Sequence, residues 1–215
     1  GERRTVAGGQ GLRRAQMDQG HPVGVVAQEQ GLARTLRAGV HRNPGTVLAS
    51  GDVEQIDGAG NVVRSDGTIT ARSVTRPPDT FYRLLAANRV QVAAHCFRRD
   101  AWQKVGGFET RLRLYGDWGL WLKLSPLGDF VHVRKIIAQY RIAYRPGIAK
   151  QRLPESLRDD ADVQCMLIPE VAKAMHGVNP QRLRKSSRQR FHAVLAEAAA
   201  MLSVSERGFA VDLLR

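Results

Sequence analysis

Three segments decide the fold: NRVQVAAHCFRRDAWQKVGGFE (residues 88–109), GDWGLWLKL (116–124) and QYRIAYRPG (139–147). The apolar run at 90–97 predicts a buried strand. Residues 99–105 predict a short helix that ends at Gly106-Gly107. A second helix is expected over 117–124, with Trp118 and Trp121 on one face, and it is followed by two short strands, 129–133 and 136–141.

The same kind of alternation continues upstream. In chain order we expect a short strand over 23–27, a helix over 28–40 and a strand over 46–56. A turn over 57–61 leads to a return strand from 62. A loop over 65–78 and a helix over 79–88 follow, and Asp79 is expected to cap this helix. Helices and strands interleaved in this order predict a mixed α/β layer fold.

After Pro154 the pattern becomes helical. A helix is expected over 155–175, with a kink or a new start at Pro169, and further helices over 179–202 and 205–214. We therefore divide the chain into a poorly defined lead-in (1–30), an α/β domain (31–150) and a helical extension (151–215).

Length and composition exclude several classes of protein. The chain has 215 residues, of which 43% are hydrophobic and 25% charged, which argues against a disordered chain, a collagen-like fibre or a disulfide mini-protein. The sequence contains no apolar run of 18 residues and shows no signal peptide at its start. Two buried, reduced thiols are expected at Cys96 and Cys165, as in a cytoplasmic protein.

Basic residues are in large excess: Lys and Arg number 33 against 20 acids, which gives a net charge of +13. Either this reflects Arg-rich codon usage or it indicates anionic partners, such as phosphates or an anionic membrane face at which the protein lies peripherally. One acid-free run, 134–152, holds six basic residues. A second cluster, 182–190, has only Phe191 as an aromatic neighbour, so nucleic acid is not the favoured partner. A solvated surface is the alternative for both.

The motifs of residues 88–147 resemble, in type and order, the acceptor-side half of family 2 glycosyltransferases, which have the GT-A fold. The matching features are a strand that ends in Phe-Arg-Arg, then Val-Gly-Gly-Phe-Glu, the Gly-Asp-Trp-Gly-Leu-Trp-Leu-Lys-Leu helix and a Tyr-Arg strand. Upstream, SGDVEQID (50–57) and GNVV (60–63) look like the middle hairpin of the family. The resemblance covers 40–147, about half of the chain, and implies a partial GT-A domain. Fewer than 40 residues precede it, so the donor-binding half is expected to be missing or degenerate.

The resemblance implies roles for several residues. Asp117 matches the catalytic base, although a carboxylate at this place also caps a helix. The turn Gly106-Gly107-Phe108 and Trp118 match the acceptor site, with the protein core as the alternative place for Trp118. Arg141 and Arg145 match positions that could meet a donor diphosphate. The implied reaction is inverting transfer of a sugar from a nucleotide-sugar to a hydroxyl of a glycan or lipid-linked acceptor, as in the synthesis of cell-surface polysaccharides.

The resemblance also implies a divalent cation, Mg²⁺ or Mn²⁺, held by an Asp-x-Asp motif. No such motif precedes the helix expected over 28–40, which leaves Glu29 and Asp52 as candidate ligands. Three further positions depart from the family pattern: Gly116, Gly119 and Ala143 stand where the family has Glu, Asp and His. An inactive glycan- or anion-binding module derived from such an enzyme is the alternative function.

Overall fold

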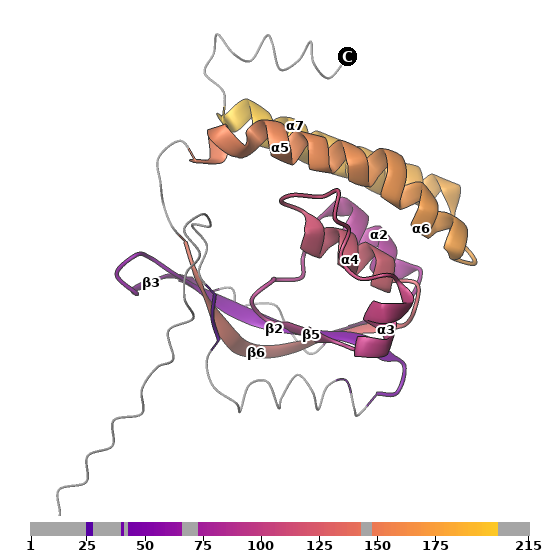
Figure 1. Ribbon diagram of the computed structural model, residues 1–215, viewed down its shortest axis with the longest axis horizontal. Coiled ribbons are helices and arrows are strands. Elements are labelled where there is room, and N and C mark those ends of the chain that lie inside the picture. Colours follow the sequence, from indigo (N-terminus) through magenta and orange to yellow (C-terminus); the bar gives the residue numbers. More distant parts are fainter. Residues whose placement is uncertain (1–24, 28–39, 41–42, 66–72, 143–147, 202–215) are drawn as a thin grey trace, which may run out of the picture.

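The computed structural model describes residues 25–27, 40, 43–65, 73–142 and 148–201. The described part is a mixed α/β structure, in which helices flank a mixed sheet and further helices follow at the C-terminal end (Figure 1). The expected fold class is thereby confirmed. The helices expected over 28–40 and 205–214 lie outside the described residues, apart from Val40.

Strand β2 (Thr46–Ile56) organises the sheet. It pairs in parallel with β6 (Asp129–Arg141) and antiparallel with β3 (Val62–Ser65) and β5 (His95–Phe97). Strands β1 (Val25–Ala27) and β4 (Ser73–Thr75) both pair antiparallel with the opposite edge of β6. Of these, β4 was not expected, because its three residues lie inside a polar segment, and β5 is much shorter than the strand expected over 90–97.

The two strands expected over 129–133 and 136–141 form one continuous strand, β6. The register explains the difference, since Gly51 pairs with Val133 while the next residue of β2 pairs with Ile136. Arg134 and Lys135 therefore lie in an irregularity of the ladder, where both are exposed. Because both residues are charged, the local sequence pattern is that of a break between two strands. Gly51 is needed here because a Cβ atom on it would lie 2.1 Å from Ile137 Cγ1.

Helices α2 (Asp79–Ala86) and α4 (Gly116–Leu124) contribute most of the large side chains of the main core, together with Leu48 of β2. The fully buried residues of this core include Phe81, Leu85, Trp118 and Trp121. Trp118 Nε1 donates a hydrogen bond to the Leu84 carbonyl oxygen at 2.8 Å, which ties the two helices together. The short α3 (Arg99–Lys104) ends where the sequence places its stop.

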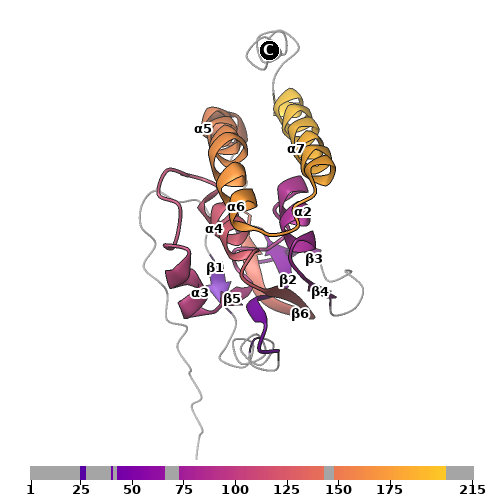
Figure 2. The same ribbon diagram turned by 90° about the vertical axis from the view of Figure 1, so that its right-hand side faces the viewer.

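The C-terminal helices form a third layer on α2 and α4, on the side away from the sheet (Figure 2). They are α5 (Ile148–Asp162), the π-helical turn η1 (Val163–Leu167), α6 (Ile168–Ala174) and α7 (Pro180–Met201). Pro169 is the second residue of α6, which follows η1 without a break in the helical backbone, whereas Pro154 lies inside α5. The Asn179 side chain caps α7 by accepting the Gln181 and Arg182 N–H groups at 2.9 and 3.1 Å.

Two expectations about single side chains are wrong. Cys165 is exposed because it lies on the outer side of η1, and Cys96 is only half-buried. Asp79 makes no side-chain capping bond and instead forms an ion pair with Arg182 at 2.8 Å. Within the part of the chain that the structure describes, no helix is both long and apolar enough to cross a membrane.

Candidate functional site

Asp117 lies in the first turn of α4, where the sequence places it. Its Oδ1 accepts the backbone N–H of Trp118 at 2.7 Å, and its Oδ2 accepts a hydrogen bond from Asn88 Nδ2 at 3.3 Å. The first contact satisfies one of the N–H groups that a helix start leaves without a partner. One carboxylate oxygen of Asp117 therefore binds the backbone at the helix start, while the other contacts a side chain from the loop after α2.

Two further titratable side chains lie within electrostatic reach of Asp117. Burial raises the pKa of the Asp117 carboxyl above its ordinary value, while hydrogen bonds from Trp118 and Asn88 and the charge of His95 oppose the rise. Burial lowers the pKa of His95, while its hydrogen bond to the Gln91 backbone and the charge of Asp117 oppose that effect. Burial also raises the pKa of Tyr140, and the negative charge of Asp117 adds to that effect. The site thus combines a carboxylate of increased basicity with an imidazole and a phenol.

Aromatic packing fixes His95. Its ring meets Trp121 edge-on, with centroids 4.5 Å apart, and stacks on Phe97 at 5.7 Å. Its Nδ1 lies 3.4 Å from the Gln91 carbonyl oxygen, which can only accept, so Nδ1 carries the proton in this contact. Neither His95 nor Asn88 stands out in the sequence, because only the packing of β5 and the α2–β5 loop against α4 brings them to Asp117.

The C-terminal layer holds the start of α4 in place. Asp159 of α5 is 0% exposed, and its Oδ2 accepts the backbone N–H groups of Leu114 and Tyr115 at 2.6 and 2.9 Å. These two residues immediately precede α4. A carboxylate that accepts two backbone N–H groups is a strong restraint. The helical extension therefore fixes the two residues that lead into the first turn of α4, where Asp117 lies.

A buried ion pair makes a second link between the extension and α4. Arg190 of α7 donates to Asp160 Oδ2 from Nε at 2.8 Å and from Nη2 at 2.5 Å. The same guanidinium lies 4.9 Å from the centre of the Trp118 ring, within cation–π range. The sequence groups Arg190 with the exposed basic cluster 182–190. The structure corrects that grouping, because Arg190 is buried in the packing between the extension and α4.

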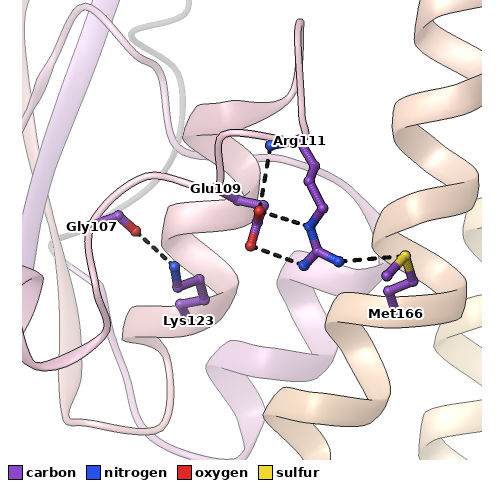
Figure 3. Close-up of polar contacts among 5 residues, drawn as sticks. All are labelled: Gly107, Glu109, Arg111, Lys123 and Met166. Atoms are coloured by element: carbon purple, nitrogen blue, oxygen red, sulfur yellow. Dashed lines mark hydrogen bonds and ion pairs between the residues drawn. The ribbon is translucent and has the colours of Figure 1, made fainter.

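The turn Gly106-Gly107-Phe108 follows α3, as expected. Both glycines have φ +73°, a left-handed conformation that side chains disfavour, and a Cβ atom on Gly107 would lie 3.1 Å from the Trp102 ring. Lys123 Nζ of α4 donates to the Gly107 carbonyl oxygen at 2.8 Å (Figure 3). Phe108, 50% exposed, is the one large apolar side chain that this turn offers to solvent.

An ion pair stabilises the chain just after this turn. Arg111 donates to both carboxylate oxygens of Glu109, at 2.8 and 3.1 Å, and also contacts Met166 Sδ of η1 at 3.5 Å (Figure 3). The hydrogen bonds lower the pKa of the Glu109 carboxyl. The turn is thus held between α4 and the C-terminal layer, although this surface ion pair by itself contributes little stability.

Trp118 and Arg141 lie in different surroundings from those that the resemblance implies. Trp118 is 1% exposed, so its ring packs in the core, the alternative place considered for it. Arg141 Nη1 donates to the carbonyl oxygens of Asp57 and Gly58 at 2.7 and 2.9 Å, which fastens the end of β6 to the β2–β3 turn. Arg145 lies outside the described residues.

Of the two candidate cation ligands, only Asp52 belongs to the described residues. Asp52 is buried and its Oδ1 pairs with His132 Nε2 at 2.9 Å, while Glu29 lies outside the described part. Within the described ranges there is no group of three His, Cys, Asp or Glu side chains suited to a metal ion. We therefore derive no chemical step through a metal.

Comparison with models of protein families finds no family that matches the chain, and no curated protein sequence matches it either.

Proposed function

We propose that the chain takes part in inverting glycosyl transfer, with Asp117 as the general base. The observation that carries this proposal is the Asp117 carboxylate itself: it projects from a rigid helix start, and burial raises its pKa. A carboxylate of raised pKa is a better proton acceptor near neutral pH than an ordinary one. The motif order that resembles family 2 glycosyltransferases supports the same assignment.

In the proposed reaction, Asp117 Oδ2 takes the proton of an acceptor hydroxyl as that oxygen bonds to the anomeric carbon of a nucleotide-sugar. The bond between the anomeric carbon and the diphosphate breaks at the same time, so the nucleoside diphosphate leaves and the anomeric configuration inverts. Asn88 orients the carboxylate through the 3.3 Å hydrogen bond. The exposed Phe108 side chain offers an apolar face against which a sugar ring can pack.

Donor binding is tested by melting the chain with UDP- and GDP-hexoses in the presence of Mg²⁺ or Mn²⁺. A ligand that binds only the folded state raises the melting temperature in proportion to ln(1 + [L]/Kd). A rise that saturates with one donor, and that Asp117→Asn retains, supports the proposal, because the base is not needed for donor binding. The absence of a shift with every donor favours the second candidate below.

The second candidate is a module that binds anionic groups, and a basic groove between α2 and α7 favours it. The groove has a volume of about 360 Å³, and its lining includes four exposed basic side chains, Arg83, Arg89, Arg182 and Lys185. Arg182 has a partner in Asp79 and lies over the Tyr82 ring at 4.3 Å. No carboxylate belongs to the described lining of this groove. Phosphate groups of a lipid-linked acceptor or of an anionic membrane surface suit this charge.

A further inference from the structure

Ser50, His132 and Asp52 form a continuous hydrogen-bonded chain on the sheet. Ser50 Oγ lies 3.1 Å from His132 Nδ1, and His132 Nε2 lies 2.9 Å from Asp52 Oδ1. Ser50 and Asp52 are 6% and 4% exposed. All three side chains come from β2 and β6, the two strands that pair over the greatest length in the described sheet.

The register of these strands creates the arrangement. Ser50 stands directly opposite His132 in the parallel ladder, and Asp52 follows two residues later on β2. An ionised carboxylate only accepts hydrogen bonds, so His132 Nε2 carries the proton in its contact with Asp52. The lone pair of Nδ1 then faces the Ser50 hydroxyl. This is the polarity that an activated serine requires: a base beside the hydroxyl, and a third group that orients the base.

A pocket opens over this chain of residues. It has a volume of about 180 Å³ and is bounded by β2, β4, β6, α2 and the loop after α2, with Ser50 and His132 both in its wall. A cavity of about 150 Å³ accommodates a ligand of the size of benzene, so this pocket has room for a small organic group. Asn88, the partner of Asp117, directly precedes two residues of its wall, Arg89 and Val90.

Thr80 contributes a buried polar side chain to the wall of the pocket. Its side chain lies in the pocket wall and is 2% exposed, yet its hydroxyl has no hydrogen-bond partner among the described residues. A buried hydroxyl without a partner costs about 1–3 kcal/mol. Arg83 and Arg89, both exposed, also line this pocket and bring positive charge to it.

We propose that Ser50 is a nucleophile that accepts the acyl group of a small ester bearing a carboxylate or phosphate. Ser50 Oγ bonds to the carbonyl carbon while its proton moves to His132 Nδ1. The tetrahedral intermediate then collapses, the bond from the carbonyl carbon to the alcohol oxygen breaks, and His132 returns the proton to the departing alcohol. Water releases the acid from the acyl-serine by the same route and restores Ser50.

The remaining residues of the pocket have roles in this step. Asp52 keeps His132 in the required tautomer and stabilises the imidazolium that forms. The Arg83 guanidinium, which lines the same pocket, is a donor for the developing oxyanion. Arg89 matches the anionic substituent of the ester. This site shares no residue with the proposed glycosyl transfer, so either proposal can fail without the other.

The test is covalent labelling of the full chain with an alkyl fluorophosphonate. Here Ser50 Oγ bonds to phosphorus as fluoride leaves, and peptide mass spectrometry locates the adduct. We expect one adduct on Ser50, none in Ser50→Ala, and labelling at least about 100-fold slower in His132→Gln. The matched control is Ser73→Ala, which removes another serine of the pocket wall, and it should label at the rate of the unaltered chain.

Turnover provides a second readout that needs no change in the buried network. We expect the chain to hydrolyse 4-nitrophenyl hydrogen succinate faster than 4-nitrophenyl acetate, and Arg83→Gln/Arg89→Gln to reduce this preference at least about tenfold. Failure of the folded, unaltered chain to form an adduct on Ser50 would overturn the proposal and leave the three residues as a buried structural network. Equal labelling of a folded His132→Gln variant would overturn it too.

Discussion

Asn88 and Asp117 are 29 positions apart in the chain, yet the Asn88 amide donates to Asp117 Oδ2 at 3.3 Å. This contact connects the loop after α2 to the first turn of α4. It also favours the ionised form of the carboxyl, against the effect of burial. Burial on one side, and the hydrogen bonds from Trp118 and Asn88 with the charge of His95 on the other, set the basicity of Asp117.

Replacement of Asn88 by Ala tests that balance. The substitution removes a hydrogen bond that lowers the pKa of the Asp117 carboxyl, so we expect this pKa to rise. A carbon-detected NMR titration of the side-chain carboxyl measures it directly. If Asp117 acts as a base, the acid limb of the rate profile moves to higher pH in parallel. An unchanged or lower pKa in Asn88→Ala would show that the amide does not contact the carboxylate in solution.

Asp117→Asn tests whether burial of the charged Asp117 carboxylate destabilises the folded state. Because the pKa of Asp117 is raised in the folded state, the folded state holds this proton more tightly than the unfolded state. The resulting stabilisation is full below the unfolded pKa of about 3.9 and disappears as the pH rises through the folded pKa. We therefore expect Asp117→Asn to melt at the same or a higher temperature than the unaltered chain at pH 7, with the difference vanishing near pH 4. A lower melting temperature at pH 7 would contradict this account.

Asp159→Ala tests whether the helical extension supports α4. The substitution leaves the N–H groups of Leu114 and Tyr115 without their carboxylate, at a cost of about 1–3 kcal/mol for each group that stays buried. We expect a clear fall in the melting temperature. The matched control is Glu155→Ala on the same helix, which removes only an exposed ion pair with Arg113 and should cost less than about 1 kcal/mol. Equal effects of the two variants would refute the supporting role of Asp159.

The groove between α2 and α7 predicts salt-dependent binding to polyanions. Retention on heparin should fall steeply between low and high salt, and Arg182→Gln/Lys185→Gln should weaken it further. Arg99→Gln/Lys104→Gln removes the same charge from α3 and serves as the control. If both double variants lose retention equally, the net charge of +13 rather than the groove is responsible.

The sequence predicts elements well where one local pattern dominates. The 11 residues of β2 and the helix that carries Asp117 lie where their hydrophobic patterns place them. It fails where long-range packing decides: β6 contains an exposed Arg134-Lys135 pair that has the local pattern of a break between two strands. Arg190 likewise belongs to a basic cluster by composition, and its ion pair with Asp160, 30 positions away, compensates for its burial.

The residues of the candidate site fall into the same two groups: those that local sequence motifs reveal and those that long-range packing brings together. Asp117 and the Gly106-Gly107 turn can be found from motifs, because a helix start and a tight turn are local structures. His95 and Asn88 cannot, since their relation to Asp117 depends on how β5 and α2 pack against α4. Asp159 has the local pattern of an ordinary surface charge on an amphipathic helix, and its two hydrogen bonds to the turn before α4 exist only in the folded chain.

The most direct test of the central proposal is the release of UDP or GDP from nucleotide-sugars in the presence of alkyl glycoside acceptors, compared between the unaltered chain and Asp117→Asn. We predict measurable turnover with at least one donor, a loss of about 10²–10⁴-fold in Asp117→Asn, and no loss of donor affinity or thermal stability in that variant. Turnover that Asp117→Asn retains would contradict the assignment of the base, and the absence of turnover with every donor would contradict glycosyl transfer by this chain.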